Sequence, residues 1–346
     1  MINNSEELIL SYIHNKDNVS SSDIYEALSN EMSQSTVKRA LIKLLAEGKI
    51  ISEGNRKSTR YSYSKKYAIL SPINVEEYFS HEIDERTVRQ GFNFDLIENV
   101  LKNITLFTDE ENRKLNILQE QFTKNIAELS LSEYEKEMER LGIDLSWKSS
   151  QIEGNTYSLL ETERLLKDKK TAAGKTKEEA IMLLNHKEAL KFILSQPDYL
   201  EHLTVSRIED IHSILIQELN VERNIRKRRV GITGTNYRPI DNQFQIKDAM
   251  QQTCDLINSR SNVFEKSLYA ILLLSYIQPF VDGNKRTARI VGNSLLIANK
   301  YCPLSFRTVD SIDYKKAMLL FYEQNNIYAF KNIFIDQYEF AVNNYF

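Results

Sequence analysis

The sequence predicts a mainly α-helical protein, with one small β-hairpin in its first domain and a second one in a later, otherwise all-helical domain. Glycine and proline are scarce, with ten and five among 346 residues. Long stretches without either carry apolar residues at three- and four-residue spacing, which is the period of an amphipathic helix. We expect a small domain over residues 1–66, a helical linker region over 67–140 and a larger helical domain over 141–346.

The composition excludes several classes of protein. A hydrophobic content of 42% and a charged content of 27% are ordinary for a globular domain. No apolar run reaches the ~20 residues that span a bilayer, so we expect no membrane partner. The first residues lack a basic and an apolar region, so we expect no signal peptide. Cys254 and Cys302 are isolated, which argues against a disulfide framework or a cysteine metal site and favours the cytoplasm.

The first 66 residues predict three helices followed by a β-hairpin. Leu8 to Ile13 carry the apolar spacing of one helix, and Ser20 to Asp23 can cap a second. The third helix runs from Ser33 to Gly48, where the glycine suits a helix end. A turn over residues 53–57 then separates two short strands. This order resembles a winged helix-turn-helix.

A local excess of positive charge lies in this domain. From Ser33 to Lys66 there are nine basic residues and two acidic ones, although the whole chain has a formal charge of −3. DNA binding is the favoured interpretation, because a basic helix precedes a basic wing. Docking of another protein and a merely solvated charged face stay open as alternatives. The candidate DNA-binding residues are Lys38, Arg39 and Lys43 on the helix and Arg56, Lys57 and Arg60 on the wing.

The segment 277–289, Ile-Gln-Pro-Phe-Val-Asp-Gly-Asn-Lys-Arg-Thr-Ala-Arg, predicts an anion site between two helices. Pro279 ends the first helix, and Gly283 and Asn284 allow unusual backbone angles. The second helix starts near Arg286, so its free N–H groups lie beside positive side chains. Asp282 is a candidate ligand for Mg²⁺.

This string resembles the signature of the Fic family of nucleotidyl-transferring enzymes. The resemblance implies transfer of AMP from ATP, with Mg²⁺, to a Ser, Thr or Tyr hydroxyl of a target protein. It assigns Mg²⁺ to Asp282, the α- and β-phosphates to Gly283, Asn284 and Lys285, phosphate binding to Arg286 and the γ-phosphate to Arg289. It names Asp282, Asn284 and Arg286 as catalytic, together with the position of Gln278. The alternative is that Arg286 and Arg289 only pair with acidic neighbours.

A second string, Ser149 to Asn155, resembles the inhibitory motif of the same family. Ser149 and Glu153 are four residues apart, so they share one face of a helix that ends near Gly154. The resemblance pairs Glu153 with Arg289, which would occupy the arginine expected on the γ-phosphate. An ordinary helix end at Gly154 is the alternative interpretation.

Residues 230–239 predict a short hairpin in a helical context. The resemblance makes it the flap that docks the target by strand-like contacts, with Gly234, Thr235 and Tyr237 as flap candidates. Arg226 falls near a basic position that precedes the flap. His212 has the spacing of a helical core residue.

Gln278 is the main departure, because it stands where the family has its catalytic histidine. A carboxamide cannot take a proton from an attacking hydroxyl. An engineered inactive variant and a natural divergent member both explain it, and relatives with a Gln-Pro-Phe start favour the second. Lys285 also occurs in the Doc branch, which phosphorylates, but Arg289 fits AMP transfer better.

We therefore expect a self-inhibited adenylyltransferase-like protein that is weakened or inactive, in a domain layout seen among bacterial Fic proteins. The alternative is a DNA-binding regulator that uses a degenerate Fic domain as a nucleotide sensor. The target protein, and the choice between monomer and homodimer, stay open.

Overall fold

The computed structural model describes residues 4–89 and 91–346. Its contacts divide the chain into two compact units, Met1–Pro72 and Ile73–Phe346. The boundary lies six residues beyond the expected one at residue 66, because a short helix after the hairpin belongs to the first unit. Among the described residues, no helix is both long and apolar enough to cross a membrane.

The first unit contains three helices, a hairpin and a fourth short helix. Ser20 and Ser33 each cap a helix by accepting a backbone N–H, as their positions predict. The antiparallel strands pair Ile50 with Tyr63 at one end and Glu53 with Arg60 at the other. The elements are α1 (Asn4–Lys16), α2 (Ser21–Leu28), α3 (Gln34–Ala46), β1 (Ile50–Glu53), η1 (Arg56–Ser58), β2 (Arg60–Tyr63) and α4 (Lys65–Leu70).

The second unit is helical throughout. Its first part holds α5 (Val75–Ser80), η2 (Leu96–Val100), η3 (Leu101–Asn103), α6 (Asp109–Glu128), α7 (Leu131–Ile152), α8 (Leu159–Asp168), α9 (Lys177–Ser195), η4 (Pro197–Leu200) and α10 (Val205–Leu215). Its second part holds α11 (Gln243–Asn258), α12 (Val263–Ile277), α13 (Asn284–Ala298), α14 (Ser311–Gln324) and α15 (Tyr328–Tyr345).

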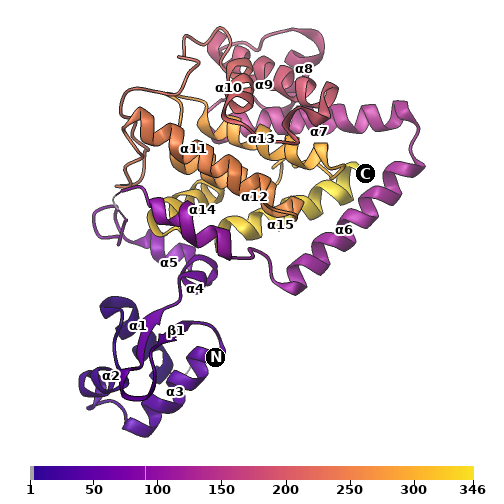
Figure 1. Cartoon of the computed structure of the whole chain (residues 1–346). Helices are drawn as coiled ribbons and strands as arrows, with labels where there is room; N and C mark the ends of the chain where they lie inside the picture. The colour runs from indigo at the N-terminus through magenta and orange to yellow at the C-terminus, as the bar shows by residue number, and fades with distance from the viewer. Residues whose placement is uncertain (1–3, 90) are drawn as a thin grey trace. The chain divides into compact units, whose positions relative to one another are not determined.

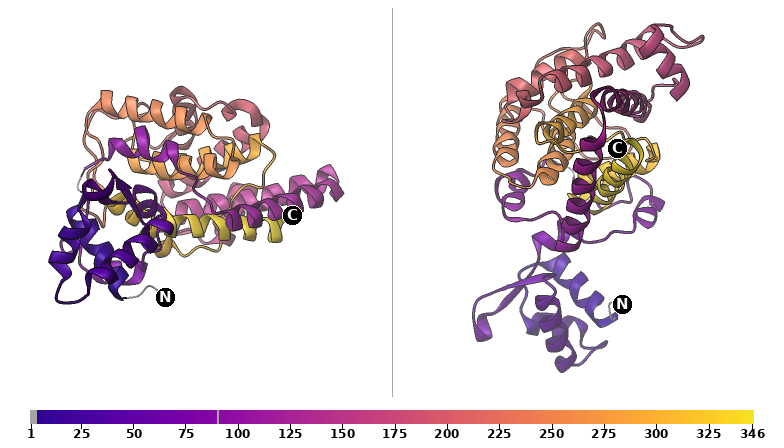
Figure 2. Two further views of the ribbon diagram at one scale, coloured as in Figure 1. Left: turned by 60° about the horizontal axis from the view of Figure 1, so that its bottom comes forward. Right: turned by 90° about the vertical axis from the view of Figure 1, so that its right-hand side faces the viewer.

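Helices α12 and α13 lie side by side at the centre of this unit (Figure 1). All but one residue of α12 is buried, as expected for a helix that is apolar on every side. Gly292 of α13 allows the close approach, since an added Cβ would lie 2.6 Å from Cγ1 of Ile271 on α12. Helices α9, α10 and α7 pack against α13, and α11 and α14 pack against α12. In both views of Figure 2 the α6–α7 pair lies beside α15.

The mainly helical fold class is confirmed, but two expectations about its parts need correction. Residues 73–140 form no linker: α5 packs on α14, η2 on α11 and α6 on α15, so they are part of the second unit. Residues 230–239 contain no regular strand, and their one bridge joins Arg238 to Gly91 in parallel. Among the described residues, β1 and β2 form the only sheet.

Candidate functional site

The loop between α12 and α13 begins at Gln278, which adopts the left-handed conformation with φ of 52°. Its amide nitrogen donates to the Ser275 carbonyl at 2.6 Å, and its amide oxygen accepts from Nδ2 of Asn284 at 3.0 Å. Both ends of the side chain are therefore held, which offsets the cost of a non-glycine residue in this region of backbone space.

Asn284 fixes the shape of the loop. Its side chain accepts from the N–H of Phe280 at 2.8 Å and donates to the Phe280 carbonyl and to Gln278. The side chain of Asn284 therefore supports the loop, and both of its amide hydrogens are used within it. The backbone N–H of Asn284, at the start of α13, is the donor that would bind phosphate.

Gly283 is required where it stands. Its φ is +79°, and an added Cβ would lie 3.3 Å from Cε1 of His212 and 3.4 Å from Ile216. His212 is buried, as predicted, and its ring stacks on Phe280 with centroids 3.6 Å apart. Burial lowers the pKa of His212 to about 4, so this ring is neutral and serves as packing beside the loop.

Arg226 joins the loop to the segment that follows α10. Sequence reasoning placed this arginine only near a basic position that precedes the flap. Its fully buried guanidinium donates to the carbonyls of Gln278 at 2.7 Å, Arg228 at 2.8 Å and Ile240. Burial lowers the pKa of Arg226, and three carbonyl partners compensate for the desolvated charge. No sequence motif identifies a buried arginine whose side-chain acceptors are all backbone carbonyls.

Arg286 is buried with most of its hydrogen-bonding capacity unused. Its Nη2 pairs with Asp282 at 3.0 Å, whereas Nε and Nη1 are buried without a hydrogen-bond partner among the described residues. No side chain caps the start of α13. Free N–H groups, a helix N-terminus and a desolvated cation together form an anion site.

Arg289 lies one turn further along α13, and each nitrogen of its guanidinium has a hydrogen-bond partner. Its Nε donates to the Ser149 hydroxyl at 2.8 Å, and its Nη2 donates to the Ser149 carbonyl at 2.9 Å and to Glu153 at 3.0 Å. Its Nη1 lies 3.3 Å from the hydroxyl of Tyr314 on α14. Lys285 adds a second cation 3.4 Å from Glu153.

The charges around Glu153 decide its protonation state. Burial alone raises the pKa of this carboxyl, but the charges of Arg289, Lys285 and Arg286, together with the Arg289 hydrogen bond, lower the pKa below its usual range. Glu153 is therefore ionised at neutral pH. It caps the end of α7, and Gly154, with φ of +100°, turns the chain away.

His186 on α9 contacts the cluster of Arg289, Glu153 and Ser149 through Ser149. Its Nε2 lies 2.8 Å from the Ser149 hydroxyl, and the side chain is fully buried. Burial and the nearby charge of Arg289 lower the pKa of His186 to about 3. The neutral imidazole therefore shares a hydrogen bond with the Ser149 hydroxyl, which also accepts from Arg289. Only the fold brings α9 to Ser149, so sequence reasoning missed His186.

A cavity of about 350 Å³ opens in front of these residues. Glu153, Gln278 and Lys285 line it together with Tyr314, Met318 and Tyr322 of α14 and with residues 231–233. The expected flap residues stand elsewhere. Gly234 has φ of +90°, Thr235 accepts from the N–H of Tyr237, and Tyr237 is buried and donates to the Tyr276 carbonyl at 3.0 Å. These three residues anchor the segment, and residues 231–233 face the cavity.

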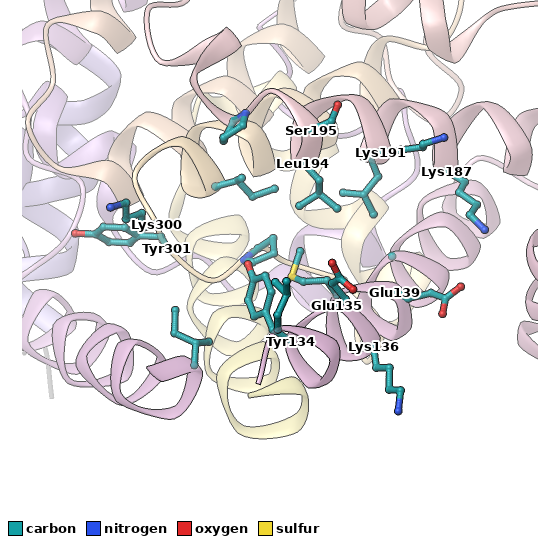
Figure 3. A pocket seen from close by; sticks show the side chains of 18 of the residues that line it. Tyr134, Glu135, Lys136, Glu139, Lys187, Lys191, Leu194, Ser195, Lys300 and Tyr301 are labelled. Carbon is teal, nitrogen blue, oxygen red and sulfur yellow. The ribbon is translucent and has the colours of Figure 1, made fainter. Parts of the chain in front are cut away.

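A larger hollow of about 900 Å³ lies at another place, between α7, the end of α9 and the end of α13 (Figure 3). Its lining is mostly apolar, with Glu135 and Lys136 of α7 and Lys187 and Lys191 of α9 among its polar residues. No residue of the strings 149–155 and 277–289 lines this hollow. The smaller cavity is lined by residues of both strings, so it is the candidate functional site.

A metal would have few protein ligands here. Within residues 4–89 and 91–346, no three His, Cys, Asp or Glu side chains gather in a way that could hold an ion. Asp282 stands alone, with 62% of its side chain exposed. A single carboxylate fits Mg²⁺, which keeps several waters and is usually shared with substrate phosphates.

The candidate DNA-binding residues differ in their surroundings. Lys43 pairs with the buried Glu6 of α1 at 2.8 Å, and Arg60 pairs with Asp23 at 2.9 Å. Lys43 therefore joins α1 to α3, and most of its charge is used within the unit. Lys38, Arg39 and Arg56 are exposed. The side chain of Lys57 lies outside the described part of the structure.

Fold and site together define a helical domain in which α13 carries two buried arginines, Arg286 and Arg289, one turn apart. Residues 202–296 match the sequence model of the Fic/DOC family, so this part of the chain is similar to that family.

Curated relatives resemble about half of the chain. The protein adenylyltransferase Fic of Nematostella vectensis is 28% identical over 172 residues, and that of Drosophila mojavensis is 30% identical over 163. These matches cover 49% and 46% of this chain. The chain spans only 40% and 32% of the length of the two relatives.

Solved structures share the fold at low identity. Fic-1 from C. elegans has a TM-score of 0.59 and 19% identity, with 68% of this chain and 72% of that chain covered. A Fic domain containing signaling protein from Bacteroides thetaiotaomicron has a TM-score of 0.56 and 20% identity, with 66% and 94% covered. These likenesses establish a common architecture over about two thirds of the chain.

Proposed function

We propose that the second unit is a Fic-type protein adenylyltransferase, or a descendant that keeps the nucleotide site and lacks efficient turnover. One observation carries the proposal: Arg286 is buried at the uncapped start of α13 with Nε and Nη1 unpartnered. An anionic ligand would supply the missing acceptors. The adjoining cavity of about 350 Å³ lies within the range of small-molecule sites.

The residues divide the work of holding ATP. Arg286, Lys285 and the backbone N–H groups that follow Gly283 would bind phosphate oxygens, and Asp282 would hold Mg²⁺ together with those phosphates. ATP, when bound, supplies an AMP group that a Ser, Thr or Tyr hydroxyl of a target protein accepts, with pyrophosphate as the leaving group. Such a site works mainly by positioning and charge stabilisation.

Gln278 limits the rate in this proposal. Its amide is held by Ser275 and Asn284, and it cannot remove a proton from the attacking hydroxyl. Loss of a general base typically costs a factor of about 10²–10⁴. We therefore expect nucleotide binding with slow or no transfer.

Glu153 and Ser149 would act as an internal inhibitor. Together with Tyr314 they occupy the donors of Arg289 that would otherwise reach the terminal phosphate. A bound triphosphate must displace the Glu153 carboxylate, which costs the Glu153–Arg289 ion pair. Inhibition within one chain follows, because α7 and α13 belong to the same unit.

The decisive experiment restores both features. We would incubate the wild type, Gln278→His, Glu153→Gly and the double variant with Mg²⁺ and ATP labelled on its α-phosphate, alone and with cell lysate. We expect label on protein only in the double variant or more than tenfold above the others, as the general-base factor implies. Absence of label in all four, with no ATP binding to Glu153→Gly by calorimetry, would overturn the proposal.

A second candidate function is DNA binding by the first unit, which we interpret as a winged helix. The exposed Lys38 and Arg39 on α3 and Arg56 at the hairpin favour it. The Fic domain would then sense nucleotide for a regulator. The test is duplex affinity against salt: neutralising these three residues should flatten the slope by about 0.9 for each lost phosphate contact. Lys16→Ala, an exposed lysine of α1, is the matched control. A slope unchanged by the triple substitution would contradict the assignment.

A further inference from the structure

Residues 75–89 and Gly91, which we name the brace, follow the first unit in the chain and contact the flap, residues 230–239. We propose that Arg86 of the brace is the positioning residue of the flap, and that the brace holds the flap in the conformation that accepts a target segment. This inference rests on the proposed function for its meaning. The contacts between the brace and the flap, on which it is based, do not depend on whether the protein transfers AMP.

Arg86 reaches the flap directly. Its Nη2 donates to the Gly234 carbonyl at 2.7 Å and lies 3.4 Å from the Glu323 carboxylate, and only 3% of its side chain is exposed. The guanidinium also lies over the ring of Phe79, 4.9 Å from its centroid. A buried arginine that shares one nitrogen between a carbonyl and a carboxylate fixes both groups relative to the brace.

Glu323 anchors the other side of this contact. It is fully buried near the end of α14, and its Oε2 accepts from the Tyr78 hydroxyl at 2.6 Å. Burial and this hydrogen bond raise the pKa of Tyr78 well above its usual range, so the phenol remains a donor. The Glu323 carbonyl also accepts the backbone N–H of Arg89 at 2.9 Å. The brace is therefore fixed to α14 by its backbone and by its side chains.

Two further contacts fix the flap beyond Gly234. Asn236 donates to Asp84 at 3.0 Å, and Arg238 forms a parallel bridge with Gly91. The brace thus follows the flap from residue 234 to residue 238. Residues 231–233, which precede this attachment, line the cavity together with Met318 and Leu319 of α14.

The arrangement gives Arg86 a role distinct from that of the loop residues. Arg86 does not line the cavity, so it cannot touch ATP or the reacting groups there. It holds the two elements that do line the cavity, the flap and α14. An irregular segment without a strand partner has little hydrogen bonding of its own, so its position depends on such anchors.

The test is hydrogen exchange of the full chain. In Arg86→Ala we expect the amides of 230–239 to exchange about tenfold faster, which corresponds to the loss of a charge-assisted hydrogen bond of about 1.4 kcal/mol. Arg89→Ala is the matched control: Arg89 lies in the same brace, but its side chain is exposed and only its backbone contacts Glu323. In Arg89→Ala we expect the amides of the flap to exchange at the wild-type rate. Arg86→Lys keeps the cation with fewer donors and should recover part of the protection.

Three outcomes would overturn the proposal: an unchanged flap in Arg86→Ala, equal acceleration in Arg89→Ala, or acceleration that also extends through α12 and α13. If Arg86→Ala does not fold, Glu323→Gln replaces it. This variant removes the charge and keeps the shape, and we expect about threefold faster exchange confined to the flap. Unchanged exchange would then count against the assignment. Exchange needs no AMP transfer, so it stays informative even if the labelling experiment fails.

Discussion

Replacing Glu153 by glutamine should tighten ATP binding while leaving the fold intact. The substitution keeps the size of the side chain and removes the negative charge that faces Arg289 at 3.0 Å and Lys285 at 3.4 Å. In the wild type, a terminal phosphate must compete with this carboxylate for the same cations. In the variant the competitor is a neutral amide with a much weaker hold.

The magnitude follows from the geometry. Two unit charges 3.0 Å apart attract by about 5 kcal/mol at an effective dielectric constant of about 20. The side chain of Glu153 is 21% exposed, and its desolvation offsets part of this attraction. A net difference on the order of 2 kcal/mol remains, which corresponds to about a thirtyfold lower Kd for ATP.

Titration calorimetry with ATP and Mg²⁺ measures this change. Glu139→Gln is the matched control, because Glu139 lies on the same helix and is exposed, and its Kd should equal that of the wild type. A Kd for Glu153→Gln within twofold of the wild type, with an unchanged circular dichroism spectrum, would refute the reasoning. The Glu153–Arg289 contact would then be structural and would not gate the site.

Two more predictions concern buried charge. His186 has a pKa of about 3 in the fold against about 6.5 when unfolded, so the unfolded chain binds a proton that the folded chain excludes, and stability falls as pH drops from 6.5 toward 3. Between pH 7.5 and pH 5 this loss is about 2 kcal/mol. Urea unfolding of His186→Gln should lack that loss, whereas His202→Gln, at an exposed histidine, should retain it; an identical pH dependence in both would contradict the assignment. Arg286→Met should leave the unliganded protein as stable or more stable, because it removes a buried cation with unused donors, and it should abolish the thermal shift that ATP produces. A persistent shift would place the nucleotide elsewhere.

Sequence reasoning could reach the local features of the site. The string from Gln278 to Arg289 indicated a turn between two helices, and the glycine at 283 was read as a conformational need, which its φ of +79° bears out. Ser149 and Glu153 share a helix face, and both contact Arg289. Residues at fixed short spacing carry such information because helix geometry translates spacing into direction.

The contacts that sequence reasoning missed all join residues that lie far apart in the chain. His186 meets Ser149, Arg226 meets Gln278, and Arg86 meets Gly234 only because distant elements pack together. Each is one ordinary helix or loop residue without a motif. The sequence predicts a short hairpin over residues 230–239, but the flap contains no regular strand. The flap backbone instead bonds to Arg86 and Gly91, and Arg226 holds the carbonyls of Arg228 and Ile240 just outside the flap.

The three buried arginines around the loop differ in how many of their donors have a hydrogen-bond acceptor. Arg226 is satisfied by carbonyls, and Arg289 by Ser149, Glu153 and Tyr314. Arg286 alone is short of acceptors. Nε and Nη1 of Arg286 are buried without an acceptor among the described residues. Because burying polar donors without hydrogen bonds costs free energy, the start of α13 carries an unmet demand for acceptors. An anion meets that demand whether or not residue 278 can take a proton. In the function that we propose, binding and turnover are therefore separable: Arg286 would govern the first and Gln278 the second, and a nucleotide sensor and a slow transferase would share the same phosphate site.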